Sequence, residues 1–199
     1  MEIRVLPDAN IWASATLHSW FGVMATESWG LWSFSWTEDI MAEAVRARRR
    51  RFPRSHSRQI EDVRDRLLPV LGKNKITNYP HDDSVLWYPD IGDAHVHSAA
   101  VAAGIDEIVS DNARDFRGIC SGLVSRSYRV YTADEWLMRA GHHAPGVVDR
   151  VIHAQWRYWM RRGRASELCE RLLRAGCPRF SCYVESRLPM PSSGCNGPG

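Results

Sequence analysis

The sequence predicts an α/β fold with three layers (α/β/α) around a central parallel sheet, followed by a C-terminal helical extension. Short apolar segments alternate with amphipathic helical segments up to about residue 140, as in parallel α/β proteins. The next stretch, to about residue 188, is helical and basic. We therefore expect a domain over residues 1–140, a helical extension over 141–188 and a disordered tail over 189–199.

The first element is a short apolar strand at Ile3–Leu6, which Pro7 closes. Asp8 and Asn10 follow it, and both residue types favour the start of a helix. We expect the helical stretch that begins here to be interrupted near Gly22.

A second strand is expected at Leu31–Ser35, followed by a helix that Thr37 caps. Glu43 falls on the flank of the apolar side of this helix, so it can point across the ends of the strands. The apolar side itself consists of Ile40, Met41, Ala44, Val45 and Ala47.

The middle of the chain reads as a helix at Ser57–Leu71, a short strand at Ile76–Asn78 and a loop at Pro80–Gly92. A helix at His95–Ala103 comes next, and Gly104 stands in the position favoured just past a helix end.

A strand at Glu107–Ser110 and a late strand at Arg129–Tyr131 complete the expected sheet. Thr132 then opens a Ser/Thr-x-x-Glu pattern typical of a capping box. The extension over Pro145–Leu188 follows, in which we expect Trp156 and Trp159 to pack on the core, although arginines beside them would also suit RNA stacking.

Bulk composition excludes several classes of protein. No apolar run is long enough for a membrane span, and the start is too charged for a signal peptide, so we expect a cytoplasmic protein. The five cysteines form no CxxC pair, which favours buried free thiols over a zinc site. We expect the tryptophans at 12, 20, 29, 32 and 36 to form core and a contact surface for a dimer or partner.

One stretch is strongly basic although the net charge is only +3. Such a patch favours a polyanion such as nucleic acid, although arginines also suit a helix C-terminus. It holds seven arginines with no acid between Val45 and Ile60: Arg46, Arg48, Arg49, Arg50, Arg51, Arg54 and Arg58.

Four acids, Asp8, Glu43, Asp93 and Asp115, stand where we expect strands to end or helices to begin. Parallel α/β sheets bind ligands beyond the carboxyl ends of their strands, so these acids are expected to converge there. Converging carboxylates repel one another unless a cation joins them, and Mg²⁺ or Mn²⁺ accepts oxygen ligands. A divalent metal site is therefore predicted.

Taken together, four motifs resemble those of the PIN-domain ribonucleases, in particular the VapC-like toxins of toxin–antitoxin pairs. They are Val5–Asn10, Trp36–Glu43, Asp90–Gly104 and Ile108–Phe116, and Leu172–Phe180 resembles a C-terminal module of one branch of these toxins. The resemblance covers residues 2–187 and implies a PIN-like fold, an Mg²⁺ or Mn²⁺ cofactor, cleavage of RNA, a small antitoxin partner and a homodimer.

The resemblance also implies residue roles. Asp8 would bind the metal directly, with Glu43, Asp93 and Asp115 completing its surroundings. Asn10, Ser110 and Asn112 would orient ligands or touch phosphate, and Asp90 is either a supporting acid or a loop residue. The expected RNA-binding residues are Arg46, Arg49, Arg50 and Arg114.

Two positions depart from the family pattern. Asn112 stands where the fourth motif has its first acid, and strand alternation favours Asn112 and Asp115 over Asp111 as the pair facing the site. No basic residue directly follows Asp93, so His95 or Arg114 would have to assist.

Other interpretations stay open at this point. The neutral Asn112 is compatible with a non-catalytic PIN-like module that binds RNA or a partner. A phosphatase using Asp8 as nucleophile would be expected to carry an acid where Asn10 stands. Taken singly, Asp8, Asn10 and Asp93 are also ordinary helix caps.

Overall fold

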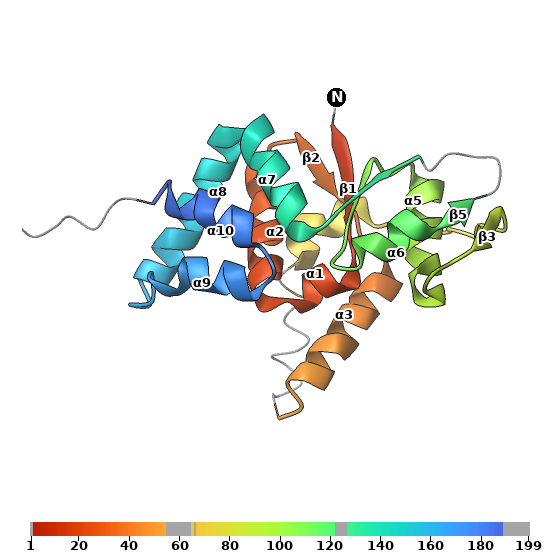
Figure 1. The fold of residues 1–199 in the computed structure, drawn as a ribbon, viewed down its shortest axis with the longest axis horizontal. Helices are drawn as coiled ribbons and strands as arrows, with labels where there is room; N and C mark the ends of the chain where they lie inside the picture. The colour runs from red at the N-terminus through yellow and green to blue at the C-terminus, as the bar shows by residue number, and fades with distance from the viewer. Residues whose placement is uncertain (1, 55–64, 66, 122–126, 189–199) are drawn as a thin grey trace, which may run out of the picture.

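A computed structural model describes residues 2–54, 65, 67–121 and 127–188. Its centre is a four-stranded sheet in the order β2-β1-β4-β6, in which every neighbouring pair is parallel. The strands are β1 (Ile3–Pro7), β2 (Trp32–Phe34), β4 (Glu107–Val109) and β6 (Arg129–Tyr131). Helices flank the sheet, which confirms the expected three-layer α/β/α architecture (Figure 1).

The other elements follow the expected alternation. They are α1 (Ala9–Ala13), α2 (Ala15–Glu27), α3 (Glu38–Arg51), η1 (Gly72–Asn74), β3 (Val85–Trp87), η2 (Ile91–Asp93), α5 (Ala94–Ala103), α6 (Ala113–Gly118), β5 (Cys120–Ser121), α7 (Ala133–His143), α8 (Pro145–Met160), α9 (Glu167–Arg174) and α10 (Pro178–Glu185). The left-handed Gly104 that ends α5 and the Thr132 capping box that opens α7 are both present.

The register of β1 and β4 positions the future site. Leu6 pairs with Ile108 and Pro7 with Val109, so the two strands end side by side. The backbone N–H of Asp8 continues the ladder by donating to the carbonyl of Val109 at 2.9 Å. Residues that follow the two strands, Asp8 and Ser110, are thereby brought to one edge of the sheet.

The hydrophobic core includes residues of α3 and α5 as well as α2 and α7, and an aromatic cluster forms its part beside β2. Trp136 of α7 is the centre of this cluster, with ring centroids 5.2 Å from Phe21, 5.3 Å from Trp32 and 5.6 Å from Phe34. These four aromatic side chains are buried, and each is worth about 1.5–3 kcal/mol of transfer free energy.

The C-terminal extension is docked on this core. Phe180 of α10 stacks edge-on against Trp20 at 5.2 Å, and its backbone N–H donates to Asp134 at 2.8 Å. The hydroxyl of Tyr183 donates to the carbonyl of Gly141 at 2.9 Å. A Cβ at Gly141 would stand only 2.8 Å from the Tyr183 ring, so a glycine is required for this approach. Trp156 and Trp159 also pack against the core, as expected.

Three expected elements were wrong. The first helix breaks at Ser14, not Gly22, because the extended Ser14 accepts a hydrogen bond from the N–H of Leu17 and starts α2 afresh. Ile76–Asn78 forms no strand: the contact with the sheet is a single bridge between Trp36 and Lys75, and Asn78 is left-handed. The Pro80–Gly92 loop contains β3, which pairs with the distant β5.

Other expectations are decided only in part. Of the helix expected at Ser57–Leu71, residues 57–64 and 66 lie outside the described residues, whereas 65 and 67–71 are helical. The tail over 189–199 also lies outside them. Four of the five tryptophans expected in the core or at a contact surface are buried, whereas Trp29 is 82% exposed. Cys177 is a buried free thiol as predicted, but Cys182 is exposed. Within the described part of the chain, no helix has the length and apolar character needed to cross a membrane.

Candidate metal centre at the carboxyl edge of the sheet

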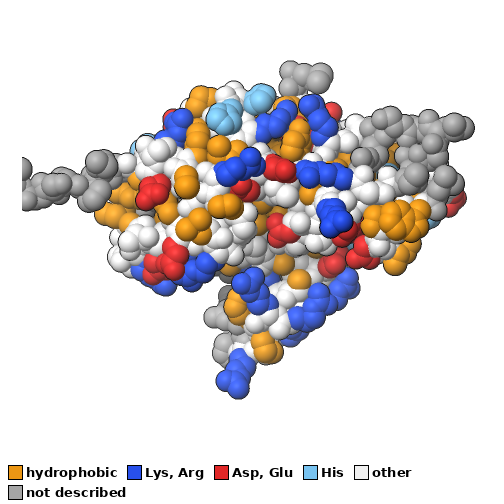
Figure 2. Space-filling view, in the orientation of Figure 1, with side chains coloured by type: hydrophobic (Ala, Val, Ile, Leu, Met, Phe, Trp, Pro, Cys, Tyr) orange, Lys and Arg blue, Asp and Glu red, His pale blue; other side chains and the backbone are white. Residues whose placement is uncertain are grey.

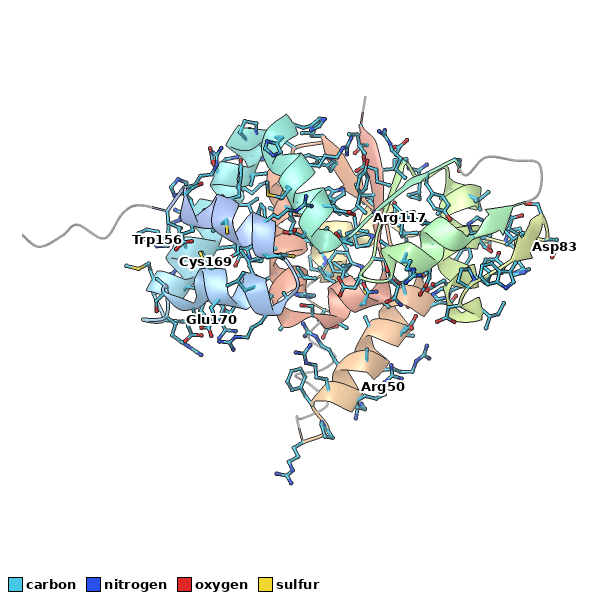
Figure 3. All side chains as sticks on the ribbon, viewed as in Figure 1. Arg50, Asp83, Arg117, Trp156, Cys169 and Glu170 are labelled. Carbon is cyan, nitrogen blue, oxygen red and sulfur yellow. The ribbon has the colours of Figure 1, made fainter. Side chains whose placement is uncertain are left out.

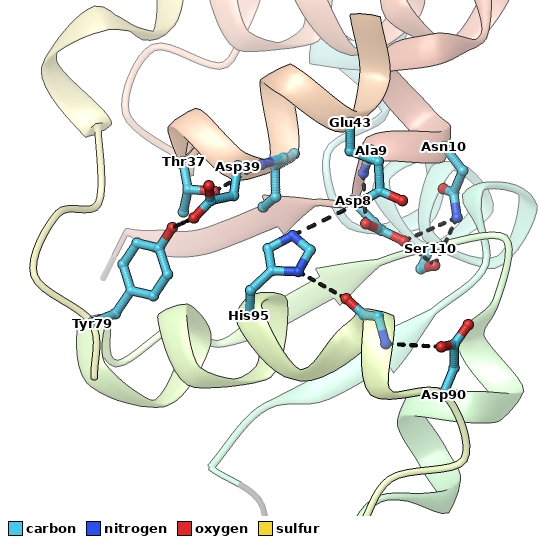
Figure 4. Close-up of polar contacts among 12 residues, drawn as sticks. Asp8, Ala9, Asn10, Thr37, Asp39, Glu43, Tyr79, Asp90, His95 and Ser110 are labelled. Atoms are coloured by element: carbon cyan, nitrogen blue, oxygen red, sulfur yellow. Dashed lines mark hydrogen bonds and ion pairs between the residues drawn. The ribbon is translucent and has the colours of Figure 1, made fainter. Parts of the chain in front are cut away.

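Asp8 is the most constrained acid at this edge. It is 5% exposed, and its Oδ2 accepts hydrogen bonds from the Ser110 hydroxyl at 2.7 Å and the Asn10 amide at 3.0 Å (Figure 4). Its Oδ1 accepts from the N–H of Ala9 at 2.6 Å, so it does cap α1. Every one of these donors is neutral. They fix the direction of the carboxylate but leave its charge uncompensated.

Ser110 and Asn10 form a small network around Asp8. The Asn10 amide also donates to the Ser110 hydroxyl at 3.0 Å, and its Oδ1 accepts from the N–H of Asp111 at 3.2 Å. Asn10 lies inside α1 and is not a cap. The predicted orienting role of Asn10 and Ser110 therefore has a geometric basis.

Asp93 is buried without compensation. It is 8% exposed and stands at the N-cap position of α5, yet its side chain makes no capping hydrogen bond. Within the described part of the chain its Oδ2 has no hydrogen-bond partner at all. A capping role does not explain this acid. An unpaired buried carboxylate oxygen is costly and calls for a different partner.

Burial and neighbouring acids raise the pKa values of Asp93 and Asp8. The pKa of Asp93 rises from 3.8 to about 7, chiefly because burial disfavours its charged form and also because Asp8, Asp90, Asp115 and Glu43 are negative. Burial likewise raises the pKa of Asp8, against the lowering effect of the Ser110 and Ala9 hydrogen bonds. The sequence-predicted acids are thus brought into one electrostatic cluster.

Glu43 reaches this cluster from the middle of α3, and not from a strand end or helix start as expected. Its side chain is 43% exposed, and its Oε2 lies 3.9 Å from Nε2 of His95. The other ring nitrogen of His95 lies 2.8 Å from the carbonyl of Gly92 (Figure 4). Of the two residues proposed to assist Asp93, it is therefore His95 that stands among the acids.

The fourth motif is arranged differently from expectation. Asp115 is half-buried in the first turn of α6 and adds negative charge near Asp93. Asn112 is exposed, and its contribution is a backbone N–H donated to Ser110 at 3.0 Å. Asp111 is also exposed. Asp90 accepts from the N–H of Gly92 at 2.8 Å, so it shapes the turn before Asp93 as well as raising the Asp93 pKa.

The predicted RNA-binding arginines are exposed. Arg46, Arg49 and Arg50 lie on α3, which is lined by basic side chains in Figure 2, and Arg114 lies in the first turn of α6. Arg50 stands on the part of α3 that projects away from the body (Figure 3). These arginines lie on α3 and α6, the helices that also carry Glu43 and Asp115, and none of them is among the charges that shift the pKa of Asp8 or Asp93.

A divalent cation fits the chemistry of this cluster. The donors are hard carboxylate oxygens, one of them has no partner, and their mutual repulsion is of the kind that a cation relieves. Among the described residues, however, no three side chains of His, Cys, Asp or Glu already stand close enough to hold an ion together. Binding would therefore require side chains, above all the exposed Glu43, to move inward.

Comparison with known proteins adds no further constraint. No protein-family model matches the chain, and no curated protein or solved structure is significantly similar to it.

Proposed function

We propose that this protein is a divalent-metal-dependent endoribonuclease with a PIN-like site. The observation that carries the proposal is the buried, unpartnered Oδ2 of Asp93 beside Asp8 at the carboxyl edge of a parallel sheet. Proteins rarely bury two uncompensated acids in one place for structural reasons, since each costs free energy of folding. Binding of a cation would compensate both carboxylates and would explain why they are buried together.

Asp8, Asp93, Glu43 and Asp115 would hold the ion. Bound Mg²⁺ or Mn²⁺ supplies a Lewis acid and a more acidic water for hydrolysis of a phosphodiester. Ser110 and Asn10 keep the Asp8 carboxylate fixed. Asp93, whose pKa burial and neighbouring acids raise to about 7, would bind such an ion in its deprotonated form.

The arginines of α3 support a nucleic-acid substrate. Arg46, Arg49 and Arg50 are exposed on the same helix that carries Glu43, so a phosphate chain attracted to α3 would be led to the acids. RNA, in preference to DNA, follows from the motif resemblance. The same resemblance underlies our proposal that the protein is the toxin of a cytoplasmic toxin–antitoxin pair, with a small antitoxin partner and a homodimeric state.

Cleavage of labelled RNA by the purified protein tests the proposal. We expect cleavage with Mn²⁺ or Mg²⁺, none with EDTA, and little of DNA of the same sequence. Asp8→Asn keeps the size of the side chain and an acceptor for Ser110. Loss of a residue that only supports a metal ligand lowers activity by about 10–100-fold. Asp8→Asn changes a proposed direct ligand, so it should lower the rate of cleavage by more than that.

Asp149→Asn is the matched control, because Asp149 is a surface acid on α8 paired with Arg187 and lies outside the cluster. It should cleave like the wild type. Equal melting temperatures for the two variants would show that lost activity is not lost fold. Undiminished RNA cleavage by Asp8→Asn would refute the assignment of the site.

A non-catalytic RNA- or partner-binding module is the second candidate. It is favoured by the neutral, exposed Asn112 and by the absence, among the described residues, of three ligands already in place. Calorimetric titration with Mn²⁺ separates the two candidates. Binding at millimolar metal or below supports the nuclease, and no heat at these concentrations supports the module.

The toxin role has its own test. Expression of the wild-type chain should arrest bacterial growth, and Asp8→Asn should not. Co-expression of the small reading frame expected next to the gene should restore growth and co-purify with the protein. Gel filtration with light scattering then reports whether the chain alone is a dimer.

A further inference from the structure

A groove leads away from the acids between α3 and the C-terminal extension. It begins at Asn10 and Asp111 and runs over the α1–α2 junction as a hollow of about 680 Å³. A second hollow of about 460 Å³ continues it, because both are lined by Ala15, Thr16 and Arg171. We call this continuous feature the α3–α9 groove. The helices that bound it, α3 and α9, lie on either side of α1 in Figure 1.

Arginines line both walls of the first hollow. Arg51 comes from α3, and Arg171 and Arg174 come from α9. Arg174 pairs with Glu170 at 2.5 Å, but both side chains are more than half exposed, and such a pair is worth at most about 1 kcal/mol. A phosphate can therefore replace Glu170 as the partner of Arg174 at little cost. In Figure 3, Glu170 on α9 and Arg50 on α3 mark the two sides.

The second hollow ends on aromatic side chains. Tyr158 and Trp159 of α8 line it, and their rings meet edge-on at 5.3 Å. The guanidinium of Arg162 lies 3.9 Å from the centre of the Tyr158 ring, and that of Arg171 lies 4.1 Å from the Trp159 ring. Arg162 covers one face of the Tyr158 ring, and Tyr158 is nevertheless 37% exposed, so part of its ring remains open to solvent. Aromatic faces beside arginines are what unstacked nucleobases bind.

We propose that the α3–α9 groove binds a single RNA strand and leads it to the acids. Arg51 and Arg174 would contact phosphates, and Tyr158 would stack on a base. A duplex keeps its bases inside the helical stack, so it would not offer one to Tyr158. This inference rests on the proposed function and extends it, because the C-terminal extension supplies one wall of the substrate path.

The charge of the groove favours RNA over a peptide. Three arginines line its two walls, and Asp111, the acid that lines the first hollow, stands at the end near the candidate metal centre. Arg171 is held by Glu167 at 2.8 Å. Arg51 and the weakly paired Arg174 therefore carry the charge open to a ligand. A regularly spaced polyanion with stackable rings matches both the arginines and the aromatic end. An acidic peptide would match only the arginines.

Binding of a fluorescein-labelled oligouridylate, measured by anisotropy in EDTA, tests the groove without cleavage. A length of about 12 nucleotides suits a single-strand site. The variant Arg51→Ala/Arg174→Ala should bind more weakly, and the slope of log affinity against log salt should fall by about 0.7 for each lost phosphate contact. Tyr158→Ala should weaken binding about 5- to 150-fold.

The matched control is Arg129→Ala/Arg187→Ala. It removes the same charge, but Arg129 lies at the start of β6, at the opposite edge of the sheet, and Arg187 pairs with Asp149. This variant should keep the wild-type affinity and salt slope. A duplex of the same length should bind more weakly than the single strand.

The failures of the two proposals are distinguishable. If Arg51→Ala/Arg174→Ala binds oligouridylate with the wild-type affinity and slope, the groove proposal is overturned, while metal-dependent cleavage still stands or falls on Asp8→Asn. A groove that binds a glutamate-rich peptide and not oligouridylate would also overturn the groove proposal. Groove-dependent binding by a protein that cuts no RNA supports the groove and refutes the nuclease.

Discussion

Buried acids lie at two opposite edges of the same sheet, and they differ in whether the fold supplies a counter-charge. Glu107, at the start of β4, is fully buried. It accepts a hydrogen bond from the indole N–H of Trp136 at 2.8 Å and forms an ion pair with Arg139. At the other edge, Asp8 has only neutral donors and the Oδ2 of Asp93 has none among the described residues.

The contrast separates an acid with a structural role from the acids for which we propose a functional one. Glu107 carries its own cation, so its charge is settled within the fold. Asp8 and Asp93 have no internal counter-charge, which lowers the stability of the fold unless a cation from solution binds them. Burial alone does not identify a site. What identifies it is burial without an internal counter-charge.

The largest expected effect concerns Glu107, the acid with a structural role. Glu107→Ala leaves Arg139 without its acid and Trp136 without its acceptor, so we expect the free energy of unfolding to fall by about 3–5 kcal/mol. Urea denaturation measures it. Glu185→Ala, on α10 at the surface, is the control and should change stability by less than about 0.5 kcal/mol. A Glu107→Ala protein as stable as the wild type would contradict this view of Glu107.

The second prediction concerns metal binding by the acids at the other edge, Asp8 and Asp93. Mn²⁺ at about 100 times its dissociation constant should raise the free energy of unfolding by about 2.7 kcal/mol. Asp93→Asn should lose most of this gain because it removes an oxygen that has no other partner. Thermal melts with and without Mn²⁺ measure the difference. An equal gain in both proteins would place the ion elsewhere.

The pH dependence is smaller and has a definite sign. The pKa of Asp93 rises from 3.8 to about 7 on folding, so the folded state holds the extra proton between these pH values. Without metal, the wild type should lose stability relative to Asp93→Asn as pH rises from about 4 to about 7. At about 1.4 kcal/mol per pKa unit the full shift would be worth about 4 kcal/mol, and we expect about half of this, about 2 kcal/mol, because solvent at the sheet edge screens the charge. The difference should level off above that range.

Denaturation of both proteins at several pH values measures this difference, which cancels the contributions of other groups. Saturating Mn²⁺ should abolish the pH-dependent loss in the wild type, because the cation then replaces the proton. A wild type that gains stability over Asp93→Asn as pH rises would mean that Asp93 already has a counter-charge.

The smallest expected effect concerns Ser110. Ser110→Ala removes one donor to Asp8 and should cost about 1 kcal/mol of stability. The same change should weaken Mn²⁺ binding about 10–100-fold, as loss of an outer partner does. Calorimetry and melting on one sample report both quantities. A large loss of stability with unchanged Mn²⁺ affinity would make Ser110 a purely structural residue.

The sequence predicted the sheet and the convergence of the acids because both follow from local pattern. Strand ends and helix starts are visible in the chain, and a parallel arrangement then places Asp8 and Ser110 at one edge. Glu43 was placed at a helix start but reaches the cluster from mid-helix, since a long side chain relaxes the requirement on the backbone.

Non-local pairing was not visible in the sequence. The strand β3 forms only because β5 lies beside it, and these segments are more than 30 residues apart. The pairing of Glu107 with Arg139, and the contribution of α9 to a groove beside Asn10, likewise depend on how distant segments meet. The sequence around an arginine does not show which distant residue it will contact in the folded protein.

Gly141 lets the C-terminal extension pack closely on α7 because it has no side chain. Tyr183 lies so close that one added carbon would collide with its ring. Gly141→Ala should therefore loosen the seat of α10 while the acids at the sheet edge keep their places. Because α10 packs on α9, which forms one wall of the proposed groove, this one methyl group is expected to weaken RNA binding there and to leave the proposed metal site unchanged.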